Sequence, residues 1–258
     1  MGIELQQLVV ALDDLLQPAM WKDYCPNGLQ VQGKKKINRL VTGVTACQAL
    51  LDEAVAVQAD AILVHHGYFW QGEAPQLVGP KLSRIKTLIE NEISLLAYHL
   101  PLDGHPEYGN NAQLARLLDF ETTGKLDNKN SSGVGFFGRL KQPMSGTELA
   151  HLIETRLNRT PLHVGIKNQL NTQENIETIG WCTGGAQGMI GLAIDMQLDA
   201  YLTGEASEQT FHQAQEAGIH FYAAGHHATE RYGVQAVGEY LAGVLDIEHR
   251  FIDIDNPV

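Results

Sequence analysis

Apolar residues along the chain alternate between helical spacing and short buried runs. Leu5, Leu8, Val9, Leu12 and Leu16 recur at helical spacing, which predicts a helix over residues 4–16. Short apolar runs bounded by polar residues indicate strands. The predicted strands are 40–45, 61–65, 93–98, 176–182, 200–203, 221–224 and 248–254. The other predicted helices are 48–57, 82–91, 110–118, 146–157, 187–197, 205–217 and 227–244.

This alternation of strands and helices predicts an α/β fold with mostly parallel sheets and helices on their faces. Residues 41–66 and 179–205 share one pattern, in which a strand leads into a helix and an Asp-Ala pair opens the next strand. The pairs are Asp60-Ala61 and Asp199-Ala200. The match indicates either two related halves or a general βαβ pattern, which recurs widely.

The pattern divides the chain into two lobes, 1–122 and 123–258. Between the repeats, residues 121–132 are polar and predict a loop. Ser145 and Glu148 fit a capping box that opens the helix over 146–157. We interpret residues 123–175 either as an inserted subdomain or as the first part of the second lobe.

Length and charge narrow the class of protein. A chain of 258 residues is long enough for one large or two modest domains. Thirty acidic residues against eighteen basic ones give a net charge of −12, which disfavours nucleic acid as a partner. Charged residues make up only 19% of the chain, which favours an oligomer because subunit contacts replace charged surface.

Targeting signals and cysteine motifs are absent from the sequence. The N-terminal stretch carries acids within its apolar positions and predicts an amphipathic helix rather than a signal peptide. No run of about 18 apolar residues predicts a membrane span. The three cysteines form no CxxC pair, so a cysteine-type zinc site is not expected. These features predict a cytoplasmic protein with reduced thiols.

One glycine motif resembles a dinucleotide fingerprint by its letters alone. Gly133, Gly135 and Gly138 have the spacing GxGxxG, but a polar loop precedes them and no helix follows. We therefore interpret the segment as a glycine-rich strand.

Histidine placement is the most informative chemical feature. The adjacent pairs His65-His66 and His226-His227 each follow a short apolar strand. Ligands bind at the carboxyl ends of strands in open α/β sheets. Adjacent residues leaving a strand point to different sides, so each pair can serve two metal ions or place one imidazole behind the other. A lone histidine would more often be a hydrogen-bonded core residue, but two pairs at equivalent strand ends favour metal binding.

Carboxylates stand beside these histidines in the predicted fold. Asp103 follows the strand 93–98, although its neighbours Pro101 and Gly104 also fit a turn. Glu230 lies four residues after His226 and shares a helical face with it, although it could equally be an exposed ion-pairing residue. The spacing does not decide between His226 and His227 as the ligand.

Imidazole and carboxylate ligands suit Zn, Mn, Fe or Ni. Three imidazoles and two carboxylates are too many for one catalytic ion and fit two ions when one carboxylate bridges them. Such a site can activate water and stabilise an oxyanion. We therefore expect two divalent cations per subunit.

Seven segments strongly resemble a known family over nearly the full chain. They are PNGLQV (26–31), VTGVTACQALLDEAV (41–55), VHHGYFW (64–70), HLPLDGHPEYGNNAQLA (99–115), CTGGAQ (182–187), TGEASEQT (203–210) and AAGHHATER (223–231). The sequence is similar to the YbgI proteins, a group within the Nif-three-like family whose members are often called GTP cyclohydrolase 1 type 2 homologues.

The resemblance implies two interlinked α/β domains, a toroidal homohexamer and a dinuclear metal site facing an internal cavity. It implies that Glu230 bridges the ions, that His66 and Asp103 hold one of them, and that His65 and His226 hold the other. The implied metal ligands are therefore His65, His66, Asp103, His226 and Glu230.

Two functions are consistent with these residues. The first is a metal-dependent hydrolase acting on a small, nucleotide-like substrate, as the GTP cyclohydrolase name implies. His99 could then act as general acid or base, or orient a ligand, while Glu205 and His227 are weaker candidates. The second is a non-enzymatic hexamer that stores, delivers or senses metal ions.

Overall fold

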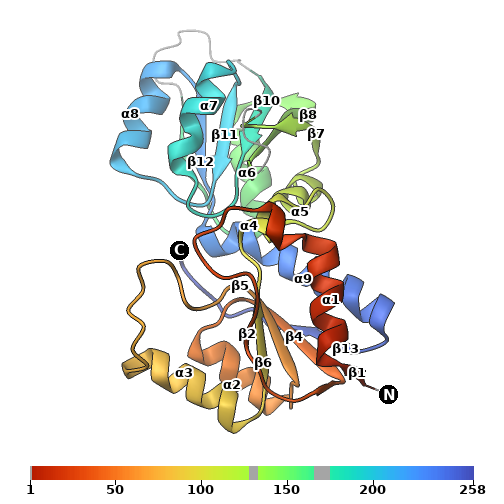
Figure 1. The fold of residues 1–258 in the computed structure, drawn as a ribbon. Helices are drawn as coiled ribbons and strands as arrows, with labels where there is room; N and C mark the ends of the chain where they lie inside the picture. Colours follow the sequence, from red (N-terminus) through yellow and green to blue (C-terminus); the bar gives the residue numbers. More distant parts are fainter. Residues whose placement is uncertain (1, 128–132, 166–174) are drawn as a thin grey trace. The chain divides into compact units, whose positions relative to one another are not determined.

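The chain folds into two compact units (Figure 1). The computed structural model describes residues 2–127, 133–165 and 175–258. The first unit contains Met1–Gly109 and Arg231–Asp255, and the second contains Asn110–Glu230 and Asn256–Val258. This division differs from the contiguous lobes 1–122 and 123–258 expected from the sequence.

Helix α9 (His226–Leu245) explains the difference. Its first turn belongs to the second unit, and its remainder belongs to the first. Val234, Val237 and Leu241 on α9 are fully buried in the hydrophobic core of the first unit. The helical periodicity of a segment does not reveal which core it packs against, so the sequence alone could not divide this helix.

The first unit is built on a five-stranded sheet. Its strand order is β13 (Glu248–Phe251), β4 (Arg39–Thr45), β5 (Ala61–His66), β6 (Ser94–Ala97) and β2 (Gly28–Val31). The first four strands are parallel, and β2 is antiparallel to β6. The prediction of a mostly parallel sheet is confirmed for this unit. A short antiparallel pair, β1 (Ile3–Glu4) and β3 (Lys36–Ile37), stands apart from it.

Helices cover both faces of this sheet (Figure 1). Leu40 and Leu63 face α1 (Leu5–Leu16) and the C-terminal part of α9. Val41 and Ile62 face α2 (Gln48–Ala56) and α3 (Gly79–Glu90). Successive residues of a strand point to opposite faces, so a sheet covered on both sides needs continuous apolar strands such as β5. Two one-turn helices, the 3-10 helix η1 (Pro18–Met20) and α4 (Leu100–Gly104), complete the unit.

The second unit contains a six-stranded mixed sheet. Its strand order is β7 (Phe120–Lys125), β8 (Phe136–Met144), β10 (Ile176–Trp181), β11 (Ala200–Thr203), β12 (His220–Ala223) and β9 (Leu162–Val164). The β10–β11 and β11–β12 pairs are parallel, whereas β7–β8, β8–β10 and β12–β9 are antiparallel. The expectation of mostly parallel sheets therefore fails in this unit.

In the second unit, too, successive strand residues contact helices on opposite faces of the sheet. Tyr201 and Phe221 pack with α7 (Ile190–Asp195) and α8 (Glu208–Ala217). Next to Phe221 on β12, the Tyr222 hydroxyl donates to the Gly146 carbonyl at the start of α6 (Gly146–Leu157). The predicted capping box at Ser145 and Glu148 is confirmed. The remaining elements are α5 (Asn110–Leu117) and the 3-10 helix η2 (Gln187–Met189), which occupies the start of the helix predicted over 187–197.

The described residues between 123 and 175 belong to the second unit's sheet rather than to an inserted subdomain. Strands β8 and β9 from this region pair with β10 and β12 of the main sheet. The segment expected as a loop over 121–132 forms strand β7 up to Lys125, and its residues 128–132 lie outside the described part of the chain. Most of β7 is exposed or half-buried at the edge of the sheet, so its strand carries no apolar pattern.

The glycine motif lies only partly within a strand, although a glycine-rich strand was expected. Gly138 lies within β8, where a Cβ atom would overlap the Glu121 carbonyl of the neighbouring strand β7. Gly133 and Gly135 precede the strand. The motif thus allows two backbones to approach closely and opens no helix.

The two halves of the internal repeat make the same contacts. Asp60 Oδ2 accepts from the backbone nitrogens of Asn38 and Arg39, at 2.8 and 3.1 Å. Asp199 Oδ2 accepts from those of Glu177 and Thr178, at 3.0 and 2.8 Å. Asp60 lies just before β5 and Asp199 just before β11. Each aspartate therefore anchors the start of the neighbouring parallel strand, which is β4 for Asp60 and β10 for Asp199. This shared arrangement supports two related halves over a coincidental βαβ pattern.

The turns that precede these aspartates are also shared. Gln58 and Gln197 both adopt the left-handed conformation, with φ of 57° and 55°. The next backbone nitrogen returns to the last turn of the helix in both cases, Ala59 to Ala54 and Leu198 to Ala193. Helices commonly end at a residue in the left-handed conformation, and that residue is usually a glycine.

We expect a histidine pair in the second unit to make stability depend on pH. His163 lies opposite Tyr222 in the β9–β12 ladder, and its Nε2 is 3.1 Å from His220 Nδ1. Burial, helped by the charge of His220, lowers the pKa of His163 to about 4. Because this folded-state value lies below the unfolded value of about 6.5, the stabilisation is complete above pH 6.5 and is lost as pH falls.

We expect His163→Gln to reduce the acid sensitivity of the protein. Between pH 7 and pH 5, the free energy of unfolding should fall by about 1–2 kcal/mol less than in the unchanged chain. Urea unfolding at both pH values measures this difference. His151→Gln, at an exposed position of α6, is the matched control. Equal pH dependence of the His163 variant and the unchanged chain would contradict the prediction.

Candidate metal centre

Three imidazoles of the first unit form a cluster at the carboxyl end of its sheet. His65 and His66 end strand β5, and His99 precedes helix α4. The ring centroids of His65 lie 4.4 Å from His66 and 5.0 Å from His99. The three ligand atoms all lie within 4.8 Å of one another, a set that could hold a metal ion. Although adjacent strand residues were expected to point to different sides, these two rings lie next to each other.

The Nδ1 atom of every imidazole in this cluster has a partner within the unit. His65 Nδ1 lies 3.1 Å from the Tyr98 carbonyl, and His66 Nδ1 lies 3.2 Å from Thr45 Oγ1. His99 Nδ1 lies 2.9 Å from Asp23 Oδ1. An imidazole that donates through Nδ1 presents Nε2 as its metal-binding atom. With Nδ1 as the donor, each of the three rings would present its Nε2 atom to a metal ion.

Asp103 places a carboxylate beside this cluster. It lies in α4 rather than in a turn, and its backbone nitrogen donates to the His99 carbonyl. Its Oδ1 is 3.4 Å from His65 Nε2. Two ligands of one ion, each bonded at about 2.1 Å, stand about 3.0–3.4 Å apart at angles between octahedral and tetrahedral. The observed separation of 3.4 Å is compatible with a shared ion.

Asp23 is a functional candidate that the sequence analysis missed. Its side chain is almost fully buried and accepts from His99 Nδ1, from the backbone nitrogen of Leu100 and from Asn27 Nδ2. Burial raises the pKa of Asp23, but its hydrogen bonds, above all that of His99, outweigh burial and hold the pKa far below its usual range. With His99 and Cys25 it forms a second set that could hold a metal ion.

The second unit brings together one imidazole and two carboxylates. His226 and Glu230 lie in the first turns of α9, and His226 Nε2 is 3.1 Å from Glu230 Oε2. His226 Nδ1 is 2.6 Å from Glu205 Oε1, which follows strand β11. Burial alone would lower the pKa of His226, but Glu230 and Glu205 together raise it to about 9. As in the imidazoles of the first unit, the Nδ1 atom of His226 lies beside an oxygen atom.

Glycines leave the space that the His226 and Glu230 side chains occupy. A Cβ atom at Gly184 would overlap Glu230 Oε1 and lie 3.0 Å from His226 Nε2. A Cβ atom at Gly204 would lie 2.7 Å from the Cα of His226. Both glycines come from segments that follow strands, β10 and β11, so the motifs CTGGAQ and TGEASEQT form the surroundings of His226 and Glu230.

His227 occupies a different environment from His226. It is buried, and its backbone nitrogen donates to the carbonyl of Val258. The two residues that the spacing left equivalent are thus distinguished by their neighbours, because the carboxylates lie against His226.

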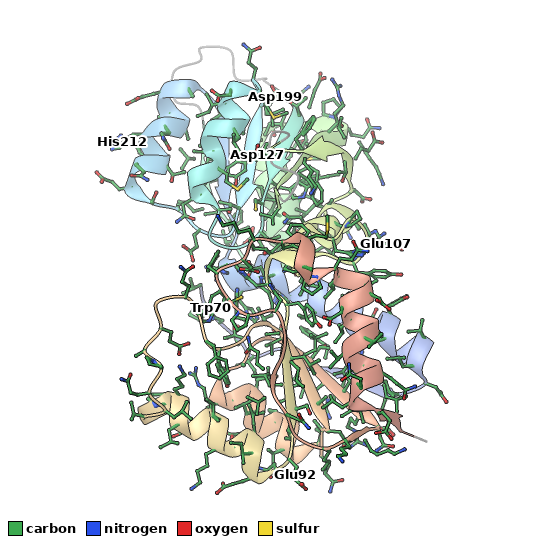
Figure 2. All side chains as sticks on the ribbon, viewed as in Figure 1. Trp70, Glu92, Glu107, Asp127, Asp199 and His212 are labelled. Carbon is green, nitrogen blue, oxygen red and sulfur yellow. The ribbon has the colours of Figure 1, made fainter. Side chains whose placement is uncertain are left out.

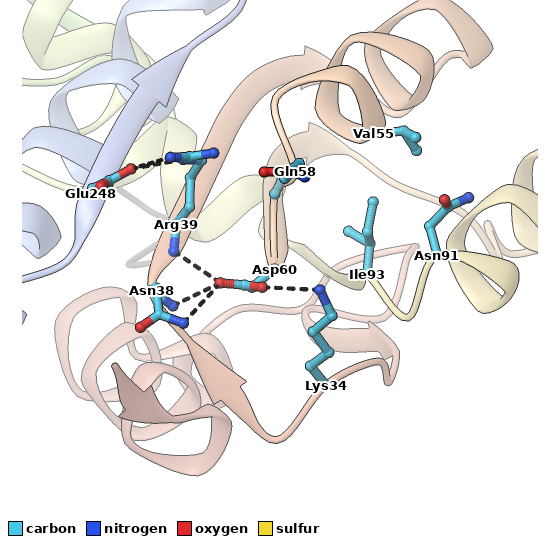
Figure 3. A pocket seen from close by; sticks show the side chains of 10 residues that line it. Lys34, Asn38, Arg39, Val55, Gln58, Asp60, Asn91, Ile93 and Glu248 are labelled. Carbon is cyan, nitrogen blue, oxygen red and sulfur yellow. Dashed lines mark hydrogen bonds and ion pairs between the residues drawn. The ribbon is translucent and has the colours of Figure 1, made fainter. Parts of the chain in front are cut away.

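A cavity of the first unit lies away from the cluster of His65, His66 and His99. It has a volume of about 560 Å³ and is lined by Lys34, Asp60 and Glu248 among others (Figure 3). It lies at the amino ends of β4 and β5, whereas His65 and His66 end β5. Its charges are paired, Lys34 with Asp60 and Arg39 with Glu248. These ion pairs therefore join the residues at the amino ends of the strands.

Comparison with known proteins gives a consistent result. The sequence profile of the family Duf34/NIF3 (NGG1p interacting factor 3) matches residues 3–257. A "GTP cyclohydrolase 1 type 2 homolog" of Pseudomonas aeruginosa is 56% identical over 257 residues and is covered completely, as is this chain. Another of that name, from Vibrio cholerae, is 53% identical over 98% of each chain. The solved structure of protein ybgI, of unknown function, matches with a TM-score of 0.93 and 49% identity over 99% of this chain and 100% of its own.

Among the described residues, no helix is both long enough and apolar enough to cross a membrane.

Proposed function

Because this chain belongs to the Duf34/NIF3 family, we propose that it is a metal-dependent hydrolase with two divalent cations per chain. Zn, Fe, Mn and Ni all suit the mixed imidazole and carboxylate ligands. The ligands in this proposal are His65, His66, Asp103, His226 and Glu230.

One shared feature of the histidines carries the proposal. Each of the three histidine ligands, and His99 as well, has its Nδ1 beside an oxygen atom of its own unit. Core histidines need no such uniformity, whereas metal ligands are held in this way to fix their tautomer and orientation.

The contacts within each unit favour one distribution of ligands. His65 Nε2 lies against Asp103, so we assign these two residues to one ion. This differs from the pairing of His66 with Asp103 that the family resemblance implies. His226 Nε2 lies against Glu230, so we assign these two residues to the second ion.

The chain supplies groups that a hydrolase needs beyond its metal ligands. The cations would activate water and stabilise negative charge that develops on the substrate. His99 is held by Asp23 with its Nε2 directed away from that carboxylate, so this nitrogen can accept or donate a proton. Glu205 orients His226 through Nδ1. An oriented proton-transfer group of this kind favours an enzyme over a metal store.

The substrate class is proposed from the relatives. Their name, "GTP cyclohydrolase 1 type 2 homolog", refers to a reaction on a purine nucleotide. We propose that the substrate of this chain is a small nucleotide-like molecule and that the assembly is a homohexamer.

We expect His66→Ala to lower metal content and hydrolysis together. Elemental analysis of the purified variant should show fewer ions per chain than the unchanged protein. Turnover of GTP and related heterocycles should fall by about 100-fold or more. His212→Ala, an exposed histidine on α8 labelled in Figure 2, is the matched control and should change neither quantity.

Two results would count against parts of this proposal. Unchanged metal content in folded His66→Ala would remove His66 from the ligand set. Two bound ions without turnover of any nucleotide, together with ready transfer of the ions to a chelating acceptor, would favour a storage or delivery protein.

A further inference from the structure

Two aromatic side chains flank the histidine cluster of the first unit. Trp70 lies in the loop between β5 and α3, labelled in Figure 2, and Tyr24 lies in the segment between η1 and β2. The Trp70 ring centroid is 5.0 Å from that of His99 and 6.0 Å from that of His66. The Tyr24 centroid is also 5.0 Å from His99. Both rings therefore lie at the edge of the candidate metal centre.

Both rings are held in position by their own loops. The Trp70 indole nitrogen donates to the Gly67 carbonyl at 3.2 Å, and its backbone nitrogen donates to Glu73. The Tyr24 carbonyl accepts from the backbone nitrogen of Gln71 at 2.7 Å, which joins the two loops. The ring centroids of Trp70 and Tyr24 are 5.6 Å apart. The indole thus has its polar group satisfied, and its half-buried ring lies beside that of Tyr24.

Core packing does not account for these positions. Tyr24 is 53% exposed, although it lies beside the buried imidazole of His99. Because so much of the Tyr24 side chain stays exposed, its burial contributes little stability to the free protein. Aromatic rings bind planar heterocycles well, because each ring offers a π face and loses little conformational freedom on binding.

We propose that Trp70 and Tyr24 form a stacking platform for a planar heteroaromatic ring, such as a purine, of the substrate. The platform would hold the ring beside His66 and His99, so that its reactive atoms face the groups proposed to carry out hydrolysis. This inference rests on the proposed function, because it assigns the substrate of the same site. It adds a binding role for two residues that are not metal ligands.

Binding of guanosine and adenosine tests the platform without involving phosphate. The full metal-loaded chain is titrated with each nucleoside, and the affinity is measured by calorimetry and by quenching of tryptophan fluorescence. Trp70→Leu should weaken nucleoside binding by about tenfold or more, whereas Trp70→Phe, which keeps an aromatic face, should stay within about threefold. Phe211→Leu, an exposed aromatic on α8, is the matched control and should have no effect.

The outcomes separate this inference from the proposed function. Metal content is measured on every variant and should equal that of the unchanged chain, since neither aromatic residue is a proposed ligand. Failure of both nucleosides to bind the unchanged chain, or equal affinity in Trp70→Leu, overturns the platform even if two ions are present. Nucleoside binding that depends on Trp70 in a chain without bound ions supports the platform and counts against the metal centre.

Discussion

Replacing Gly184 with alanine should abolish tight metal binding by the second unit's ligands. A Cβ atom there would overlap Glu230 Oε1, so the carboxylate would have to move. The backbone cannot yield easily, because the Gly184 nitrogen donates to Thr229 Oγ1 and its carbonyl accepts from Thr203 Oγ1. A φ of +68° adds strain for any side chain. We expect metal affinity to fall by about 100-fold, measured by competition with a chelator of known affinity.

Gly191→Ala is the matched control for this substitution. Gly191 lies in α7, and a Cβ atom there would meet nothing within 4 Å. Alanine is the better helix former, so this variant should gain about 0.5–1 kcal/mol in stability and keep its metal ions. A folded Gly184→Ala protein with unchanged metal affinity would show that Glu230 and His226 are not ligands in the arrangement described.

Asp23→Asn, which replaces one carboxylate oxygen with an amide nitrogen, should strongly lower the stability of the protein. The buried carboxylate accepts from His99, Leu100 and Asn27, and an amide would turn a donor toward one of these groups. Hydrogen bonds to a charged group contribute about 1.5–3 kcal/mol, and an unsatisfied buried donor adds a further cost. We expect the free energy of unfolding at pH 7 to fall by about 2–4 kcal/mol, measured by urea denaturation.

Asp23→Asn should also change how the stability depends on pH and how fast the substrate is turned over. The pKa of Asp23 is lower in the folded protein than in the unfolded chain, so its stabilisation is present above about pH 4 and is lost as pH falls below that value. Asp23→Asn should therefore lose less stability on acidification. Its metal content should persist while turnover falls by about 10–100-fold, because His99 would lose its orientation.

Asp52→Asn, at an exposed position of α2, controls for the change of charge. It should alter stability by less than about 0.5 kcal/mol. Equal stability of Asp23→Asn and the unchanged chain would mean that the carboxylate does not hold His99 as described.

The buried elements of the fold could be predicted closely from the sequence. The strand predicted over 200–203 matches β11, and the one over 61–65 differs from β5 by a single residue. Both strands are covered on two faces, so burial forces a continuous apolar run that the sequence displays. Strand β7 was missed because it lies at an edge and its exposed positions carry polar residues.

The candidate site was predictable only in part. His65 and His66 were found because two histidines at the end of an apolar strand are unusual, and Glu230 because it lies one helical turn from His226. Asp23 has no such local sign. It lies 76 residues before His99 in the chain, in a segment without periodicity, and only the folded structure brings the two together.

Counting metal ions on the intact protein tests the central claim most directly. Native mass spectrometry combined with elemental analysis of the full chain gives the number of subunits and of ions per subunit together. We predict two divalent cations per chain in a hexamer and a lower count in His66→Ala. A correctly folded chain that retains no cation after loading with Zn, Mn, Fe or Ni would contradict the account.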